Sequence, residues 1–169
     1  MSEFLEYETG DGEQRKQDCE TKAFHRLAAR IKEAFPRLPM MLLLDGLYPN
    51  GPIMERCRSY HWDFMIVLKE GSLPSVWEEY YSLILEQEEN QMQQNWGERR
   101  QHFQWVNPIR YEYGPNAKKF IDVQVVVCRE QWEALDPDTA EIVTVENKHA
   151  WISSRPLSRL NVLLRPSFQ

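Results

Sequence analysis

The sequence lacks most of the features that mark a secreted, disulfide-stabilised or membrane-spanning protein. Its three cysteines, Cys19, Cys57 and Cys128, lie far apart and are odd in number, so they predict neither a disulfide framework nor a cysteine metal site. Such cysteine usage is typical of a reducing compartment, and we expect a cytoplasmic protein. No apolar run approaches the roughly 20 residues that a membrane-spanning helix needs, and the acidic start does not resemble a signal peptide. We therefore expect no membrane partner.

Common catalytic motifs are missing as well. The four histidines stand alone, without a partner at a spacing that metal ligands use. The sequence contains no glycine-rich phosphate loop, and no serine or cysteine lies in a nucleophile motif with a base. It also shows no internal repeat. These absences leave carboxylates as the residues to consider for chemistry.

Positive charge is scarce except in one block. The net charge of −6 argues against a strong free-standing nucleic-acid binder. Residues 21–60 nevertheless hold seven basic and three acidic residues, a net charge of +4, whereas residues 1–20 and 61–101 each carry −5. This block suits a site that phosphates approach, and it is equally consistent with solvated helix faces.

The basic block surrounds the most informative stretch of the chain. Five apolar residues at 40–44 run directly into Asp45 and Gly46, which predicts a strand buried on both faces, followed by a sharp turn at the glycine. In open α/β sheets, ligands bind at the carboxyl ends of such strands. Aspartate is also common in ordinary turns. The residue types alone therefore leave a functional and a purely structural role of Asp45 open.

A second strand follows after a short helix. Asn50 is suited to cap a helix that begins near Pro52 and ends near Ser59, and the mostly apolar residues 62–68 predict the next strand. A strand, a helix and a strand within about thirty residues predict a βαβ unit with two parallel neighbours. The acidic residues nearby, Glu55 and Asp63, have no spacing that directs them toward Asp45.

Two further helices flank this unit in the prediction. Apolar residues at helical spacing between 20 and 35 predict a helix that is capped by Asp18 and ended by Pro36. Pro74 begins another helix, which we expect to reach about Gln87. Residues 88–101 are rich in Gln, Asn and Glu and predict a polar connection or a frayed helix end.

The second half of the chain has the alternating pattern of antiparallel strands. Alternation begins at Phe103 and continues to about residue 127, with turn residues at 114–116 and 136–138 and two short strands predicted at 142–145 and 150–152. We therefore expect a flexible lead-in at residues 1–17, an α/β region at 18–90 and a β-rich region at 91–169.

Several segments resemble one known family. Together, the chain from about residue 14 to 160 resembles the DDE transposases of bacterial insertion sequences, on the strength of Lys16–Glu20, Lys22–Phe24, Phe35–Pro39, Leu42–Tyr48 and Val67–Lys69. The resemblance implies an RNase H-like core interrupted by a β-rich insertion. It also implies DNA transposition and recombination, with the transposon ends as the DNA partner.

The resemblance assigns a role to one residue. Family members use three carboxylates to bind two Mg²⁺ (or Mn²⁺) ions, which activate water or a DNA 3′-hydroxyl for attack on a phosphodiester. Asp45 matches the second of these carboxylates, so it is the predicted catalytic residue and metal ligand. The resemblance indicates no particular DNA-binding residues.

The first Asp and the Glu of the family's triad have no counterpart that we identify. Nothing before residue 20 has the pattern of the strands that would carry the first Asp, and the chain stops where the Glu-bearing helix is expected. We therefore expect a partial RNase H-like core, truncated at its C-terminus, that is inactive alone because one carboxylate cannot hold two metal ions.

Two alternatives stay open. The chain is also consistent with a non-catalytic interaction module that self-associates through an open sheet edge or binds an intact transposase. A compact metal nuclease would require two further carboxylates close to Asp45 in space.

Overall fold

The structure is a computed structural model that describes residues 13–163, with side chains from residue 20 onward. The part of the predicted lead-in at residues 1–12 and the end of the predicted β-rich region at 164–169 lie outside the described residues. The helices are α1 (Glu13–Ala34), α2 (Gly51–Ser59), α3 (Pro74–Leu83) and the 3₁₀ turn η1 (Pro115–Ala117). The strands are β1 (Met41–Leu44), β2 (Asp63–Val67), β3 (Gln91–Trp96), β4 (Arg99–Tyr113), β5 (Lys119–Leu135) and β6 (Ile142–Ser153).

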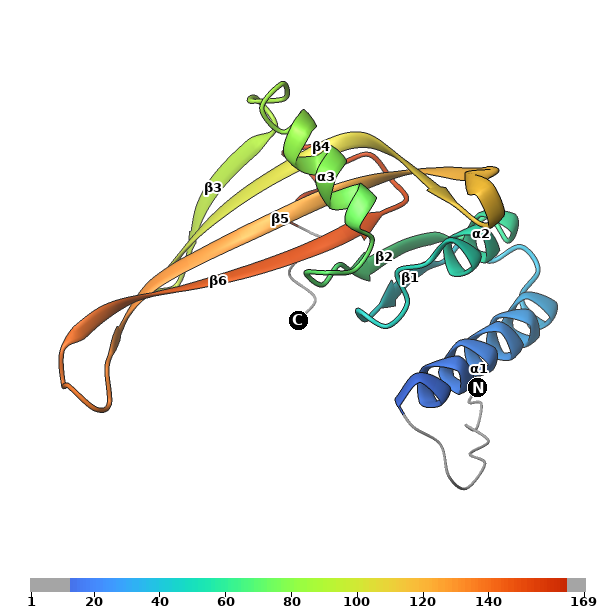
Figure 1. Cartoon of the computed structure of the whole chain (residues 1–169), viewed down its shortest axis with the longest axis horizontal. Coiled ribbons are helices and arrows are strands. Elements are labelled where there is room, and N and C mark those ends of the chain that lie inside the picture. Colours follow the sequence, from blue (N-terminus) through green and yellow to red (C-terminus); the bar gives the residue numbers. More distant parts are fainter. Residues whose placement is uncertain (1–12, 164–169) are drawn as a thin grey trace.

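All six strands form one sheet in the order β1-β2-β6-β5-β4-β3. Only β1 and β2 run parallel, and every other neighbouring pair is antiparallel. Figure 1 shows the long β5 and β6 strands extending past the helices, with α1 at the other end of the molecule. The predicted mixed α/β fold class is confirmed at this level. The predicted boundary near residue 90 crosses this sheet, because β2 of the first region pairs with β6 of the second.

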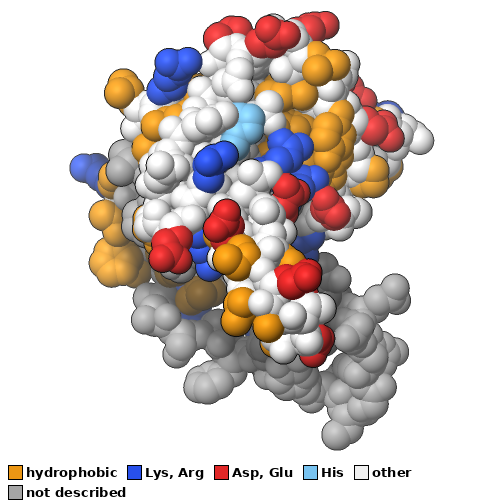
Figure 2. Space-filling model, turned by 90° about the vertical axis from the view of Figure 1, so that its left-hand side faces the viewer, with side chains coloured by type: hydrophobic (Ala, Val, Ile, Leu, Met, Phe, Trp, Pro, Cys, Tyr) orange, Lys and Arg blue, Asp and Glu red, His pale blue; other side chains and the backbone are white. Residues whose placement is uncertain are grey.

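Figure 2 views the molecule from the end at which the β3–β4 and β5–β6 hairpins lie. It shows charged side chains of both signs, with a histidine and several basic side chains near the middle of the view. Within the described residues, none of the helices has the length and apolar character required to cross a bilayer.

The predicted βαβ unit is confirmed. Met41 to Leu44 of β1 lie opposite Asp63 to Ile66 of β2 in a parallel register. The connecting helix α2 begins as the sequence predicts, because the Asn50 side chain accepts a hydrogen bond from the Ile53 N–H at 3.0 Å. Pro52 in the first turn has no N–H that would need a partner.

The expectation that the first strand is buried on both faces is wrong. β1 is the last strand of the described sheet, and Met41 and Leu43 are 39% and 51% exposed. Leu42 and Leu44 pack against the core from the other face. The apolar run predicts the strand correctly. Burial on both faces depends in addition on neighbouring strands and helices, which a local sequence pattern does not reveal.

Three element boundaries also differ from the prediction. Helix α1 begins at Glu13, so Asp18 does not cap it, and residues 13–17 belong to the helix rather than to a flexible lead-in. Helix α3 ends at Leu83 instead of reaching Gln87. The two strands predicted at 142–145 and 150–152 are one continuous strand, since Glu146 to His149 continue the ladder with β5.

The polar segment at 88–101 forms strand structure rather than a loop or a frayed helix. Gln91 to Trp96 pair with Arg99 to Gln104 across a turn that contains Gly97, whose φ is +60°. Polar side chains pair across this hairpin as well, for example when the Gln94 amide donates to the Gln101 carbonyl oxygen at 2.6 Å. Pairing with β4 thus outweighs the low intrinsic strand preference of glutamine and asparagine.

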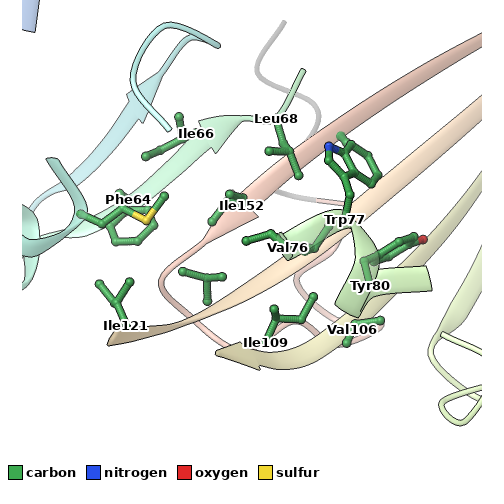
Figure 3. Packing of buried hydrophobic residues seen from close by; sticks show 14 of the residues in the cluster. Phe64, Ile66, Leu68, Val76, Trp77, Tyr80, Val106, Ile109, Ile121 and Ile152 are labelled. Atoms are coloured by element: carbon green, nitrogen blue, oxygen red, sulfur yellow. The ribbon is translucent and has the colours of Figure 1, made fainter. Parts of the chain in front are cut away.

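The core has one layer on each face of the sheet. On the face covered by α2 and α3, here called the helical face, strand residues such as Phe64, Ile66 and Ile152 form one cluster with Val76 and Tyr80 of α3 (Figure 3). The opposite face is covered by the segment after β6 and holds a smaller cluster, which includes Met65, Phe103, Trp105, Val126, Trp151, Leu157 and Val162. The central strands are therefore buried on both sides, while β1 and the outer ends of the hairpins are not.

Candidate functional site

Asp45 follows β1 directly and is exposed at the carboxyl end of the strand. Its Oδ1 accepts a hydrogen bond from the Leu47 N–H at 2.9 Å, and its carbonyl oxygen accepts from the Tyr48 N–H at 3.2 Å. The carboxylate thus stabilises the turn in the ordinary way for aspartate. This contact occupies one carboxylate oxygen and leaves the residue at the sheet edge where open α/β sheets bind ligands.

Lys69 reaches the same edge from the neighbouring strand. It lies just beyond the end of β2, and the carboxyl ends of the parallel strands β1 and β2 meet at one edge. A Cβ atom on Gly46 would lie 2.5 Å from Lys69 Cε and 2.7 Å from its Cγ. The lysine stem therefore occupies the space that a side chain at position 46 would need.

This contact changes the expected role of Gly46. The sequence predicted a glycine that permits a sharp turn, but a positive φ is found at Gly71, Gly97 and Gly114 and not at Gly46. What restricts position 46 is instead the close approach of Lys69, whose flexible side chain would have to move to admit a Cβ atom. The sequence contained a usable signal for Lys69, because the residues after each of two parallel strands meet at the same sheet edge.

Helix α1 closes one side of the site. The rings of Phe24 from α1 and Tyr48 pack with their centroids 5.7 Å apart. Burial raises the pKa of Tyr48, and the negative charges of Glu20 and Asp45 raise it further. Tyr48 is therefore a neutral phenol near two carboxylates, one of which, Glu20, was not singled out from the sequence.

The other acidic candidates lie elsewhere. Glu55 faces outward from α2, where it accepts hydrogen bonds from the Tyr113 hydroxyl and from Arg58 at 2.8 Å. Asp63 begins β2, at the opposite end of the strand from Lys69, and forms an ion pair with Arg155 at 2.5 Å. Neither carboxylate lies close to Asp45. This agrees with their spacing in the sequence, which does not direct them toward Asp45.

Two residues of the basic block, Lys32 of α1 and Arg56 of α2, pack around Tyr60 at the end of α2. Lys32 donates to the carbonyl oxygens of Pro36 and Tyr60 at 2.7 and 3.0 Å. Arg56 lies 5.4 Å from the centroid of the Tyr60 ring. Burial lowers the pKa of His25, and the charge of Arg56 lowers it further. These contacts favour the structural explanation of the block for the residues involved, while Lys69 is the basic residue that reaches the edge beside Asp45.

Metal binding at this edge would need oxygen ligands beyond Asp45. Among residues 20–163, whose side chains the structure describes, no three His, Cys, Asp or Glu side chains form a group suited to one metal ion. Hard divalent cations prefer about six oxygen ligands, of which waters and substrate phosphates can supply several. The arrangement can therefore contribute one carboxylate and one nearby ammonium group to a site that is completed by other ligands.

Comparison with known proteins returns neither a matching family model nor a matching curated protein.

Proposed function

We propose that this chain forms part of the catalytic region of a DDE transposase, with Asp45 as one metal-binding carboxylate of an RNase H-like core. One observation carries the proposal: in the parallel β1–α2–β2 unit, β1 leads directly into an exposed Asp45 at the edge of the sheet. The resemblance of residues 42–48 to the family supplies the reaction, which is cleavage and strand transfer of DNA.

The chemistry of this reaction explains why the chain is expected to be inactive alone. Two Mg²⁺ or Mn²⁺ ions must be held to stabilise both the attacking and the leaving oxygen. In the described residues, Asp45 and the neighbouring Glu20 are the carboxylates near Tyr48. These two residues are not sufficient to hold both metal ions. The outer edge of β1 is the place at which a further strand would add another carboxylate beside Asp45.

Metal binding by Asp45 tests the proposal. We expect weak Mn²⁺ binding, measured by water-proton relaxation, to be lost in Asp45→Asn. Asparagine keeps an oxygen that accepts from the Leu47 N–H but removes the charge that attracts the cation. Asp138→Asn is the matched control, because Asp138 is exposed in the β5–β6 turn, far from β1 (Figure 1).

Two outcomes would contradict this proposal. Mn²⁺ binding that is equal in the native chain, Asp45→Asn and Asp138→Asn would remove the metal role of Asp45. Cleavage of DNA by the isolated chain with Mg²⁺, abolished by Asp45→Ala, would show a complete active site and would contradict the expected inactivity.

A second candidate function is a non-catalytic interaction module that self-associates. The observation that favours it is the outer strand β1, whose sequence is entirely apolar and whose Met41 and Leu43 side chains are exposed. Edge strands are usually protected by charge, proline or a bulge, and an apolar edge pairs readily with another strand.

Sedimentation velocity separates the two candidates. In the interaction-module proposal, Leu43→Lys should shift the protein from dimer to monomer, because a charged side chain blocks edge pairing. Leu85→Lys is the control, since Leu85 is 74% exposed and lies after α3. A native chain that is monomeric at high concentration would exclude this candidate and leave the metal-binding proposal unaffected.

A further inference from the structure

A row of basic side chains crosses the sheet beside α3. On the helical face, His102 of β4 lies directly opposite Arg129 of β5, which in turn lies directly opposite Lys148 of β6. Arg100 occupies the next position on this face, opposite Gln131. Adjacent strands are about 4.8 Å apart, so the row from β4 to β6 spans about 10 Å.

The fold neutralises only one end of this row. Lys148 forms an ion pair with Glu70 at 2.7 Å and lies 4.6 Å from the centroid of the Trp77 ring. Arg129 donates to the neutral Gln104 side chain at 2.7 Å, and no carboxylate among the described side chains of residues 20–163 pairs with it or with Arg100. Like charges at directly opposite positions destabilise a sheet. A bound anion would relieve this repulsion.

The row opens into a groove at the point where β2 leaves the sheet. This groove has a volume of about 570 Å³, and Lys69, Arg129 and Lys148 all line it. Lys69, which lines the groove, also lies with its stem against Gly46, at the edge that carries Asp45. Basic side chains therefore extend from the candidate metal ligand to the far side of β4.

Three acidic residues also line the groove, and two of them are paired. Glu70 is bound to Lys148, as described above. Glu130 is buried and forms an ion pair with Arg99 at 3.0 Å on the opposite face of the sheet. Glu146 accepts a hydrogen bond from the Gln131 amide at 2.5 Å and has no basic partner among the residues that line the groove. The unpaired charges of Lys69 and Arg129 exceed it within this lining.

We infer that the groove and the row hold the phosphodiester backbone of a nucleic-acid strand on its way to Asp45. The inference deepens the proposed function and rests on it for the direction of the strand. Phosphate oxygens are bound by Arg and Lys together with Gln and Asn amides. Amide side chains flank the row here, because Gln93 lies directly opposite His102 and Gln104 accepts from Arg129.

Oligonucleotide binding tests the inference directly. The probe is a fluorescein-labelled single-stranded oligonucleotide of mixed sequence, with a length of about 20 nucleotides that allows several phosphate contacts. Its fluorescence anisotropy is measured in the presence of EDTA at low and moderate salt. Arg129→Gln and Lys69→Gln should each weaken binding about threefold or more at low salt and lower the salt slope by about 0.7, the value for one phosphate contact on a single strand. Arg110→Gln and Lys118→Gln are matched controls near η1, at the other end of β4, and should change binding less than twofold (~0.4 kcal/mol).

The folded state of the variants is checked by circular dichroism, and a second measurement needs no variant. In NMR titration of the native chain, the ring signals of His102 should shift when the oligonucleotide is added. His61 precedes β2, at the end of that strand opposite to Lys69, and its ring signals should not shift. A shift at His61 alone would overturn the inference.

The remaining outcomes distinguish failure of this inference from failure of the proposed metal role of Asp45. No binding at low salt, or equal losses in test and control variants, would overturn the inference. Poly-glutamate that displaces the labelled oligonucleotide as readily as unlabelled oligonucleotide does would also overturn the inference and would indicate an acidic protein partner. Because EDTA is present, the assay does not depend on a metal at Asp45. Mn²⁺ binding at Asp45 without oligonucleotide binding therefore removes only this inference, and the reverse result removes only the proposed metal role.

Discussion

The parallel and the antiparallel regions of the sheet differ in how they bury their strands. β1, which leads into Asp45, leaves Met41 and Leu43 exposed, whereas β5 has an unbroken buried run from Val123 to Cys128. β5 has neighbours on both sides and side-chain layers on both faces, while β1 has β2 alone within the described sheet. The residues suited to chemistry therefore lie on the less buried part, supported by a well-packed antiparallel sheet.

Several contacts join these regions, in addition to the core on the helical face. β2 pairs with β6 over Met65 to Val67, and the Tyr113 side chain of β4 packs against Gly51 and hydrogen-bonds to Glu55 of α2.

The largest expected difference concerns burial itself. Ile152→Ala, in the centre of the sheet where Ile152 is fully buried, should lower the free energy of unfolding by about 2–5 kcal/mol through lost burial and a cavity. Leu43→Ala on β1 should cost only about 0.5 kcal/mol, because its side chain is half exposed. Urea denaturation of both variants measures this contrast. Equal losses would mean that β1 is as deeply packed as the centre.

The same contrast explains what could be predicted from the sequence. The βαβ unit was predictable, since its strands, its Asn50 cap and Pro52 are local signals. The edge position of β1 was not, because it depends on the absence of a second neighbouring strand. β3 was missed because its glutamines become strand residues only by pairing with β4, which is a non-local effect.

The candidate site shows the same limit. Asp45 was predictable from an apolar run that ends in an acidic residue. The position of Lys69 could have been predicted, because the carboxyl ends of parallel strands meet at one edge of the sheet. Its contact with Gly46 could not, because this is a tertiary contact. Glu20 comes to Tyr48 only through the packing of α1. The row of Arg129 and its neighbours required the strand register, which alternation alone does not define.

A smaller effect is expected at the contact between the regions. In Gly51→Ala, the new Cβ atom would overlap the Tyr113 ring, and we expect destabilisation of about 1–3 kcal/mol from overpacking. In a Tyr113→Ala background, the same change should be neutral or stabilising, because alanine favours a helix over glycine. Thermal denaturation of this double-mutant cycle gives the coupling. Equal effects of Gly51→Ala in both backgrounds would show that the ring does not restrict position 51.

The smallest effect concerns pH. The Tyr113 hydrogen bond and, next, the Arg58 contact hold the pKa of Glu55 below its usual 4.5. Because the folded-state pKa is lowered, the stabilisation is present above pH 4.5 and is lost as the pH falls through the folded-state value. Glu55→Gln should therefore flatten the acid limb of the stability curve by less than about 1 kcal/mol, since the group is solvent-accessible.

The matched control for this change is the exposed Glu112 on β4. Urea midpoints of the native chain, Glu55→Gln and Glu112→Gln between neutral and acidic pH provide the measurement. An unchanged acid limb in Glu55→Gln would show that the contact between Glu55 and Tyr113 adds no charge-dependent stability between the regions.

The pairing of β2 with β6 also has a consequence for how the chain folds during synthesis. The Phe64 N–H donates to the Ser154 hydroxyl, 90 residues later in the chain. At translation rates of 5–20 residues per second, about 5–20 seconds separate the emergence of these two residues from the ribosome. During that interval, the strand pair that carries Asp45 exposes the apolar edge that β6 later covers. A nascent chain at this stage is a natural substrate for chaperones, and the part of the protein made first is completed last.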